Sequence, residues 1–216
     1  MFDDVTVIGA GRAGSTIAAR LRERGMPVRP RAALQLICVP DRAIAEVAAS
    51  IEPGPWVAHV SGGTPLSALD PHERRFSVHP LQTLTRDGGA AQLDGAWGAV
   101  PAETAQGLEH AEWLADTLGL RPFVLADDKR ALYHAGASMA SNFLVTLYHA
   151  AEHLFDAAGA PPAALIPLME RTIENGFDLT GPIVRGDWET VDRHVAALDG
   201  TGVEPLYSAL AKATRP

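Results

Sequence analysis

The feature that most constrains this chain is a glycine motif close to its start. The six residues Gly9-Ala10-Gly11-Arg12-Ala13-Gly14 have the spacing GxGxxG. They follow the β-prone run Val5-Thr6-Val7-Ile8 and precede residues 16–24, whose apolar residues recur at helical spacing. In such a strand, loop and helix, the first glycine permits the turn, the second lets a pyrophosphate approach the backbone, and the third packs helix on strand. We interpret the motif as a dinucleotide-binding loop; a tight turn without a ligand is the alternative.

Strand and helix patterns alternate through the first half of the chain. Further strand candidates are residues 34–39, 56–60, 76–78, 97–100 and 122–125. Helices are expected after Asp41 and over residues 103–118. This alternation predicts an α/β fold, a Rossmann-like parallel sheet covered by helices.

After residue 126 the sequence carries only helical patterns. They cover residues 128–158, 161–175, 187–198 and 203–213. We therefore predict two domains: a dinucleotide-binding Rossmann-like domain of residues 1–126, and a smaller all-helical domain of residues 127–216 for substrate binding and dimerisation.

The region that should recognise the cofactor ribose is unusual. No Asp or Glu occurs between Arg24 and Pro40, although NAD-binding folds place an acidic residue about 20 residues after the glycine motif. Arg29 and Arg31 would meet a 2'-phosphate if residues 26–28 form the second strand, which favours NADP over NAD. Solvated surface arginines are the alternative.

The same region is also short. Only the eight residues 26–33 separate Gly25 from the strand candidate at Leu34. A crossover between parallel strands needs a dozen residues or more. We therefore expect a β-α-β piece to be absent, with either an abbreviated adenosine site or an altered strand order.

Polar groups follow the predicted strands. Val39 and Pro40 end one strand, Ser61 follows the next, and His79 and Gln82 follow the third. Ligands of open α/β sheets bind outside the carboxyl ends of the strands. We expect Val39, Pro40 and Ser61 to contact the cofactor, and Ser61 and Gln82 the substrate. His79 is a candidate for proton transfer because imidazole titrates near neutral pH; a structural histidine is the alternative.

The long helical segment carries a stripe of polar residues. At 100° per residue, His134, Ser138, Ser141 and Asn142 fall within about a third of the circumference. We expect this stripe to line a crevice, with Ser138 and Ser141 contacting substrate; an exposed helix face is the alternative.

Four residues are candidates for polarising the reacting group and delivering a proton. They are His79, Asn142, Lys129 and His134. Ideal helix geometry turns Lys129 about 140° away from His134. We therefore rank Asn142 and His79 above the other two.

Composition excludes several classes of protein. The chain has 26 acidic and 18 basic residues and a net charge of −8, so no basic surface for nucleic acid is expected. No apolar run is long enough to cross a membrane and the first residues are acidic, so we expect a cytoplasmic protein. The single Cys38 cannot form an internal disulfide, and no metal site is suggested.

Motifs along nearly the whole chain resemble those of one family. They are Val7 to Gly14, Val39-Pro40-Asp41, His79-Pro80-Leu81-Gln82-Thr83, Tyr133-His134-Ala135 with Ala140-Ser141-Asn142-Phe143-Leu144, and Leu179 to Asp187. These stretches resemble Rossmann-like bacterial proteins whose C-terminal domain was long labelled as of unknown function.

The resemblance implies a relative of the 6-phosphogluconate, 3-hydroxyacid and pyrroline-carboxylate reductase group, with a helical second domain that usually forms a dimer. Some members resemble ketopantoate reductases that use NADPH. The His79-Pro80 pair is similar to the substrate-side His-Pro of prephenate dehydrogenases. The short region 26–33 departs from the family pattern.

The segment 179–187 suggests a carboxylate site. Gly181 and Gly186 permit backbone conformations closed to other residues, and Arg185 supplies a planar fork for a carboxylate. We expect Arg185 to bind a carboxylated substrate; a salt bridge between the domains is the alternative.

These patterns predict an NADP-dependent oxidoreductase. Hydride would pass from NADPH to the carbonyl or imine carbon of a small carboxylated metabolite, as in ketopantoate reductase-like enzymes. A homodimer is expected because the thin helical domain would otherwise expose apolar surface. The alternative is a non-catalytic nucleotide- or metabolite-binding regulator with a degraded adenosine site, which the short region 26–33 favours.

Overall fold

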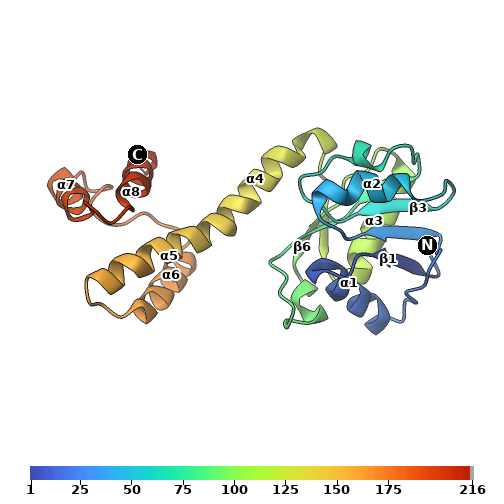
Figure 1. Cartoon of the computed structure of the whole chain (residues 1–216), viewed down its shortest axis with the longest axis horizontal. Helices are drawn as coiled ribbons and strands as arrows, with labels where there is room; N and C mark the ends of the chain where they lie inside the picture. The colour runs from blue at the N-terminus through green and yellow to red at the C-terminus, as the bar shows by residue number, and fades with distance from the viewer. Residues whose placement is uncertain (215–216) are drawn as a thin grey trace. The chain divides into compact units, whose positions relative to one another are not determined.

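A computed structural model describes residues 1–214 of the chain (Figure 1). Its residue contacts divide the chain into two compact units, Met1–Ser141 and Asn142–Pro216. The division falls 15 residues after the boundary predicted at residue 126, which stays a prediction.

The first unit is built on a four-stranded parallel sheet. Its strands are β1 (Val5–Ile8), β2 (Leu34–Ile37), β3 (Trp56–His59) and β4 (Arg75–Ser77), and they lie side by side in that order. All three pairings are parallel, so the carboxyl ends of the four strands share one edge. The predicted Rossmann-like α/β fold is confirmed.

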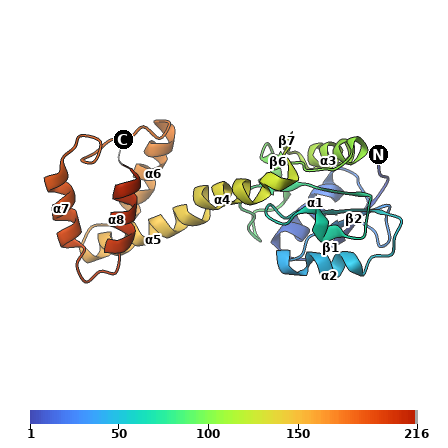
Figure 2. The same ribbon diagram turned by 90° about the horizontal axis from the view of Figure 1, so that it is seen from above.

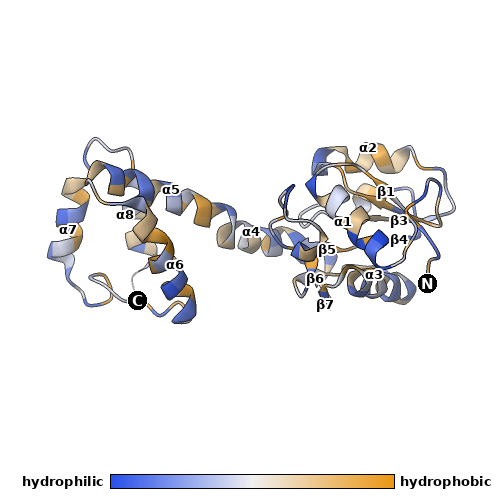
Figure 3. Cartoon of the chain, turned by 90° about the horizontal axis from the view of Figure 1, so that it is seen from below, coloured by the Kyte–Doolittle hydropathy of each residue, from blue (hydrophilic) through white to orange (hydrophobic). Residues whose placement is uncertain are grey.

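Two apolar clusters cover the two faces of this sheet. Alternate residues of β2 divide between them: Leu34 and Leu36 belong to the larger cluster and Ile37 to the smaller. Such strands, buried on both faces, are nearly continuous in apolar residues. Figures 2 and 3 show the layers, with apolar strands between helix α2 and helix α3.

Three helices and a short turn form the outer layers. Helices α1 (Arg12–Glu23) and α3 (Ala105–Leu118) bury Ile17, Leu21 and Leu114 in the larger cluster. Helix α2 (Ile44–Ala49) and the 3-10 turn Leu66–Leu69 supply the smaller cluster. Gly119 ends α3 in the left-handed conformation.

The remaining strands form a separate sheet. Strand β5 (His79–Leu81) pairs antiparallel with β6 (Trp97–Ala99), and β6 pairs parallel with β7 (Arg121–Phe123). The expected strands at 97–100 and 122–125 are therefore present, whereas β5 was not predicted. Its Pro80 lacks a donor for the ladder and is unusual inside a strand.

The sheet shows what is missing after α1. Val28 makes a single parallel bridge to Val5 on the outer edge of β1, and the chain then runs directly to β2 on the other edge. We call the short segment that bridges β1 at Val28 the stub. In the doubly wound order 3-2-1-4-5-6, the stub takes the place of strand 2, and β2, β3 and β4 take the places of strands 4, 5 and 6. Strand 3 and the helix before it are absent, as the length of region 26–33 predicts.

The predicted helix over 128–158 consists of three consecutive pieces. These are the 3-10 turn Asp127–Lys129, helix α4 (Arg130–Ala140) and helix α5 (Asn142–Ala157). Ser141, with φ −118° and ψ −74°, separates α4 from α5.

The second unit is helical, as predicted. Helix α5 contacts α6 (Leu165–Glu174), and α7 (Trp188–Ala197) contacts α8 (Glu204–Ala213). Among residues 142–214, only Leu165, Val191 and Leu198 are buried apolar residues.

Candidate active site

The glycine loop joins β1 to α1 at the carboxyl edge of the sheet. Gly9 has φ +116°, and a Cβ there would meet the Cys38 carbonyl oxygen at 2.4 Å. A Cβ on Gly14 would meet the Gly9 carbonyl oxygen at 2.1 Å, whereas one on Gly11 would find no atom within 4 Å. The outer glycines are therefore required by packing, and the middle glycine faces open space, which is the arrangement that lets a pyrophosphate approach.

The start of α1 leaves backbone donors at this loop. Its first backbone bond runs from the Ser15 N–H to the Gly11 carbonyl, at 2.9 Å. The amides before Ser15 are those that a helix cannot pair internally, and they favour an anion. A small cavity of about 230 Å³ lies beside Gly11, and Arg12 and Arg86 line it.

The loop after β3 is held by a serine hydroxyl. Ser61 Oγ lies 2.9 Å from Asp41 Oδ2 and 2.9 Å from Thr64 Oγ1, and it accepts the Thr64 N–H at 3.0 Å. Ser61 is buried. Its hydroxyl joins the loop after β2 to the loop after β3 and so shapes the crevice. These contacts leave the hydroxyl little capacity for a hydrogen bond to a ligand.

Arg130 connects α4 to the sheet. The side chain is 2% exposed. Its Nε donates to Asp127 Oδ1 at 2.6 Å and one terminal nitrogen donates to the Ser61 carbonyl at 2.9 Å. The other terminal nitrogen donates to the Ser77 hydroxyl. Asp127 in turn accepts the Leu66 N–H, so this one ion pair ties α4 to the loops after β3 and β4.

A histidine and tyrosine pair lies where β4 ends. His79 Nδ1 and the Tyr133 hydroxyl are 2.7 Å apart, and the ring centroids of His79 and His134 are 5.8 Å apart. Gly62 fits between the histidines, because a Cβ on it would meet His79 at 2.7 Å and His134 at 2.8 Å. Each of these side chains is partly exposed.

Burial holds this pair in its neutral form. It lowers the pKa of His79 to about 4, helped by His134 and by the positive charge of Arg130. Burial also raises the pKa of Tyr133 to about 12. At neutral pH the phenol therefore keeps its proton and the imidazole carries one, so the pair can donate a hydrogen bond without a net charge.

His59 lies beneath the same loops and is fully buried. Its Nδ1 accepts the Ser61 N–H at 3.2 Å, so Nε2 carries the proton. Burial lowers the pKa of His59 to about 3, and Arg130 adds to the effect. The Pro65 carbonyl favours the protonated ring, but Nε2 has no partner of good hydrogen-bond geometry within residues 1–214.

The predicted catalytic residues divide into two groups. His79 and His134 lie close together, so the structure places His134 nearer to the centre of the site than its rank among the predicted catalytic residues implied. Lys129 is exposed and pairs with Asp128 at 3.0 Å, so its charge is already partnered. Asn142 begins α5 in the second unit and is exposed, and its role stays a prediction.

The predicted substrate contacts also differ in setting. Ser138 is partly buried on α4, and Ser141 is the residue between α4 and α5. Gln82 is exposed, and its side-chain amide oxygen Oε1 accepts a hydrogen bond from the backbone N–H of Thr83 at 2.9 Å. Arg185 is exposed in the second unit, where Gly181 and Gly186 have the predicted positive φ.

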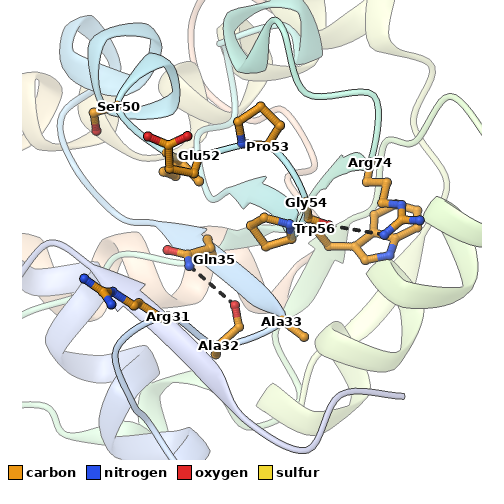
Figure 4. Close-up of a pocket in the computed structure, with 12 residues that line it drawn as sticks. Arg31, Ala32, Ala33, Gln35, Ser50, Glu52, Pro53, Gly54, Trp56 and Arg74 are labelled. Carbon is orange, nitrogen blue, oxygen red and sulfur yellow. Dashed lines mark hydrogen bonds between the residues drawn. The ribbon is translucent and has the colours of Figure 1, made fainter.

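The cofactor arginines are placed less favourably than predicted. Arg31, which has φ +58°, lines a cavity of about 790 Å³ with Ala33, Trp56 and Arg74 (Figure 4). These residues precede or begin β2, β3 and β4, so the cavity lies at the amino edge of the sheet, opposite the glycine loop. The assignment of Arg31 to a 2'-phosphate is corrected on this ground. Arg29 is exposed beside the start of β1.

Sequence reasoning did not select Tyr133 or Arg130 as site residues. Tyr133 is one position before His134 in a motif that was noted, but an aromatic residue on a helix is usually packing. Arg130 follows three charged residues and resembled a solvated helix start. Only the tertiary structure buries it.

The model of the domain of unknown function DUF2520 matches residues 97–214, more than half of the chain. The chain belongs to the DUF2520 family. The resemblance to bacterial proteins with a C-terminal domain of unknown function is thereby confirmed, whereas the likeness to ketopantoate reductase stays a prediction. No curated protein matches the sequence.

Several solved structures share the fold. A Bacteroides fragilis protein described as a candidate NADP oxidoreductase is 21% identical, with a TM-score of 0.82 over 98% of both chains. Protein TM1727 from Thermotoga maritima is 26% identical, with a TM-score of 0.68 over 83% of this chain and 75% of its own. A reductive aminase from Aspergillus terreus, in complex with NADPH and ethyl levulinate, is 16% identical, with a TM-score of 0.68 over 100% and 95%.

No helix within residues 1–214 is long and apolar enough to cross a membrane. Across the same residues, no group of three or more metal-binding side chains is present.

Proposed function

We propose that this DUF2520 protein is an NAD(P)H-dependent oxidoreductase that reduces the carbonyl or imine carbon of a small carboxylated metabolite. The observation that carries the proposal is that an open glycine loop and a neutral His79–Tyr133 pair lie at the same edge of one parallel sheet. Ligands of such sheets bind at that edge. The fold shared with NAD(P)-binding oxidoreductases supports the proposal.

The residues around Gly11 fit a pyrophosphate. Gly9 and Gly14 pack the turn, Gly11 leaves room for the backbone to be approached, and the first amides of α1 point out of the helix. Val39 and Pro40 follow β2 next to this loop and would contact the nicotinamide half. Of the two arginines predicted to meet a 2'-phosphate, only Arg29 is then left to favour NADP over NAD.

A bound nicotinamide would supply the hydride. The chain's own part is the proton, which must reach the substrate oxygen or nitrogen as the carbon is reduced. The Tyr133 hydroxyl and His79 share a hydrogen bond, so that one of them can pass a proton to the substrate and the pair then regains that proton from solvent water. Arg130 acts by position, since it fixes α4, which carries Tyr133 and His134, against the loops after β3 and β4.

The carboxylate of the substrate needs a cationic partner. Arg185 remains our candidate, with Asn142, Ser138 and Ser141 as further polar contacts. A ketopantoate-like 2-oxo acid meets this description, and so does an imine formed from an oxo acid.

We also propose that a second copy of this chain covers the helical unit. Large apolar residues of that unit are exposed, including Phe143, Leu168, Phe177 and Leu179. Exposed apolar surface of this extent marks an interaction site, and the family resemblance implies a dimer. The alternative function, a non-catalytic regulator, keeps the crevice but predicts no turnover.

The test is a screen for reduced-cofactor oxidation with 2-oxo acids and with oxo acids plus amines. With an active substrate, Tyr133→Phe should lower turnover roughly a hundredfold, the typical effect of losing one donor to a developing anion. His79→Asn should act in the same direction. Thr117→Val on α3, which removes a hydroxyl bonded only within its helix, is the matched control and should leave turnover unchanged.

The outcomes separate the two functions. Tight cofactor binding without turnover on any oxo acid or imine supports the regulator. Full turnover in Tyr133→Phe shows that the proton comes from elsewhere.

A further inference from the structure

The stub at Val28 ends before it becomes a strand. In a parallel pair of strands, a residue that bonds to the neighbouring strand does so through both its N–H and its C=O. The next residue of the same strand that bonds in this way lies two positions further along. Val5 does this with the stub: its N–H donates to the Pro27 carbonyl at 3.0 Å, and its carbonyl accepts the Arg29 N–H at 3.0 Å. Val7 would be next, and the corresponding stub residue is Pro30.

Thr6 turns the chain away at this point. Its hydroxyl donates to the Arg29 carbonyl at 2.7 Å and accepts the Ala32 N–H at 2.9 Å. The Arg29 carbonyl, which would have accepted the Val7 N–H, is therefore occupied by a side chain. The segment then leads to β2 on the other edge of β1.

This turn removes the usual adenosine contacts. The stub leaves the sheet beside Thr6, two residues before β1 ends at Ile8, or about 7 Å short of that end of the strand. The loop that follows carries no Asp or Glu, and Arg31 lines the cavity at the opposite edge. No strand 3 or preceding helix stands beside the stub among the described elements.

The nicotinamide half of the site is by contrast complete. The glycine loop follows β1, Pro40 and Asp41 follow β2, Gly62 follows β3 and His79 follows β4, all at one edge. The two halves of a dinucleotide therefore meet very different surfaces.

We propose that this protein holds its cofactor through the nicotinamide mononucleotide half and the pyrophosphate position, with little contribution from adenosine. Reduced nicotinamide mononucleotide then binds nearly as well as NADPH or NADH. The inference rests on the proposed function, since it concerns the same cofactor site.

The size of the expected effect follows from the missing contacts. Hydrogen bonds between a carboxylate and two ribose hydroxyls are together worth about a hundredfold in affinity. Without them, the three dissociation constants should agree within about tenfold.

The experiment measures binding by nicotinamide fluorescence on the full chain. NADPH, NADH and reduced nicotinamide mononucleotide are titrated at one ionic strength, and 5'-AMP and 2'-AMP are added as competitors. Gly11→Val should abolish binding of all three reduced cofactors, because a side chain there fills the approach to the backbone. Arg31→Ala should change none of the constants, and Arg74→Ala beside it is the matched control.

Each result has a defined meaning. Similar constants for the three cofactors, with no displacement by either AMP, support the inference. NADPH or NADH binding more than about tenfold tighter than the mononucleotide overturns it and leaves the oxidoreductase proposal intact. Displacement by AMP also overturns it. No binding of any reduced cofactor overturns the proposed function and this inference with it.

Discussion

The two units of this protein differ in how their helices are buried. In the first unit, α1, α2 and α3 lie against a sheet whose strands are apolar on both faces, and residues such as Phe76 and Leu114 have no exposed surface. In the second unit, four amphipathic helices leave Phe143 56% exposed and Phe177 69% exposed. A helix with amphipathic periodicity still needs another surface against which its apolar face can pack. The first unit contains that surface, and we propose that a second copy of the chain supplies it to the second unit.

The largest expected effect is on the core of the first unit. Phe76→Ala should lower the free energy of unfolding by about 3–5 kcal/mol at every protein concentration, because it opens a cavity in a fully buried cluster. Phe143→Ala should have a cost that shrinks on dilution, because in the proposed dimer a second copy covers its ring. Urea unfolding at two protein concentrations measures both. A loss for Phe143→Ala that is equally large and independent of concentration would show that the second unit buries this ring itself.

A second comparison concerns arginines. Arg130→Met should cost about 3 kcal/mol, because it leaves the Asp127 carboxylate and the Ser61 carbonyl without their donor in a mostly buried setting. Arg193→Met is the matched control, since Arg193 pairs with Glu189 at 2.9 Å on the exposed surface of α7. An exposed pair of this kind is worth about 0.5 kcal/mol or less. Equal costs for the two variants would contradict the anchoring role of Arg130.

The third prediction is acid sensitivity of the first unit. The pKa values of His59 and His79 lie near 3 and near 4 in the folded chain, below the ordinary value of 6.5. Between pH 6.5 and pH 4 the unfolded chain therefore binds more protons than the folded one, and the free energy of unfolding falls as the pH falls. Each histidine contributes a slope of about 1.4 kcal/mol per pH unit.

Thermal unfolding followed from pH 7 to pH 4 measures this slope. His59→Asn keeps an acceptor for the Ser61 N–H and cannot titrate, so it should make the profile shallower. An unchanged profile in this variant would assign the acid sensitivity to other groups.

The smallest changes in stability are expected for substitutions at surface residues. For these variants the two units are distinguished by the molecular mass of the protein in solution. The double variant Phe143→Asp and Leu147→Asp places charges one helical turn apart on α5, and light scattering should then give the monomer mass near 22.8 kDa. Val124→Asp in the first unit, at a site 64% exposed, is the control and should leave the mass and the stability within about 0.5 kcal/mol unchanged. A wild-type chain that is already monomeric would remove the proposal of a second copy.

Local patterns in the sequence are enough to predict most of the strands and helices and the kind of site. The glycine spacing located the loop, the β-rich runs located β1, β2, β3 and β4, and the eight residues before Leu34 showed that a β-α-β piece is missing. These features depend on neighbours a few positions apart, so that periodicity, turns and chain length suffice to predict them.

The tertiary structure decided which polar residues act together. Tyr133 and His79 are 54 positions apart and meet where Arg130 bonds α4 to the loop after β3 and to the end of β4. Arg31 lies in the eight-residue region 26–33, where a complete second strand would run, yet the Thr6 hydroxyl turns this segment and Arg31 lines the cavity at the amino edge of the sheet. Contacts between distant segments depend on how layers pack and where buried charges find partners, and neither is encoded in the spacing of residues along one element.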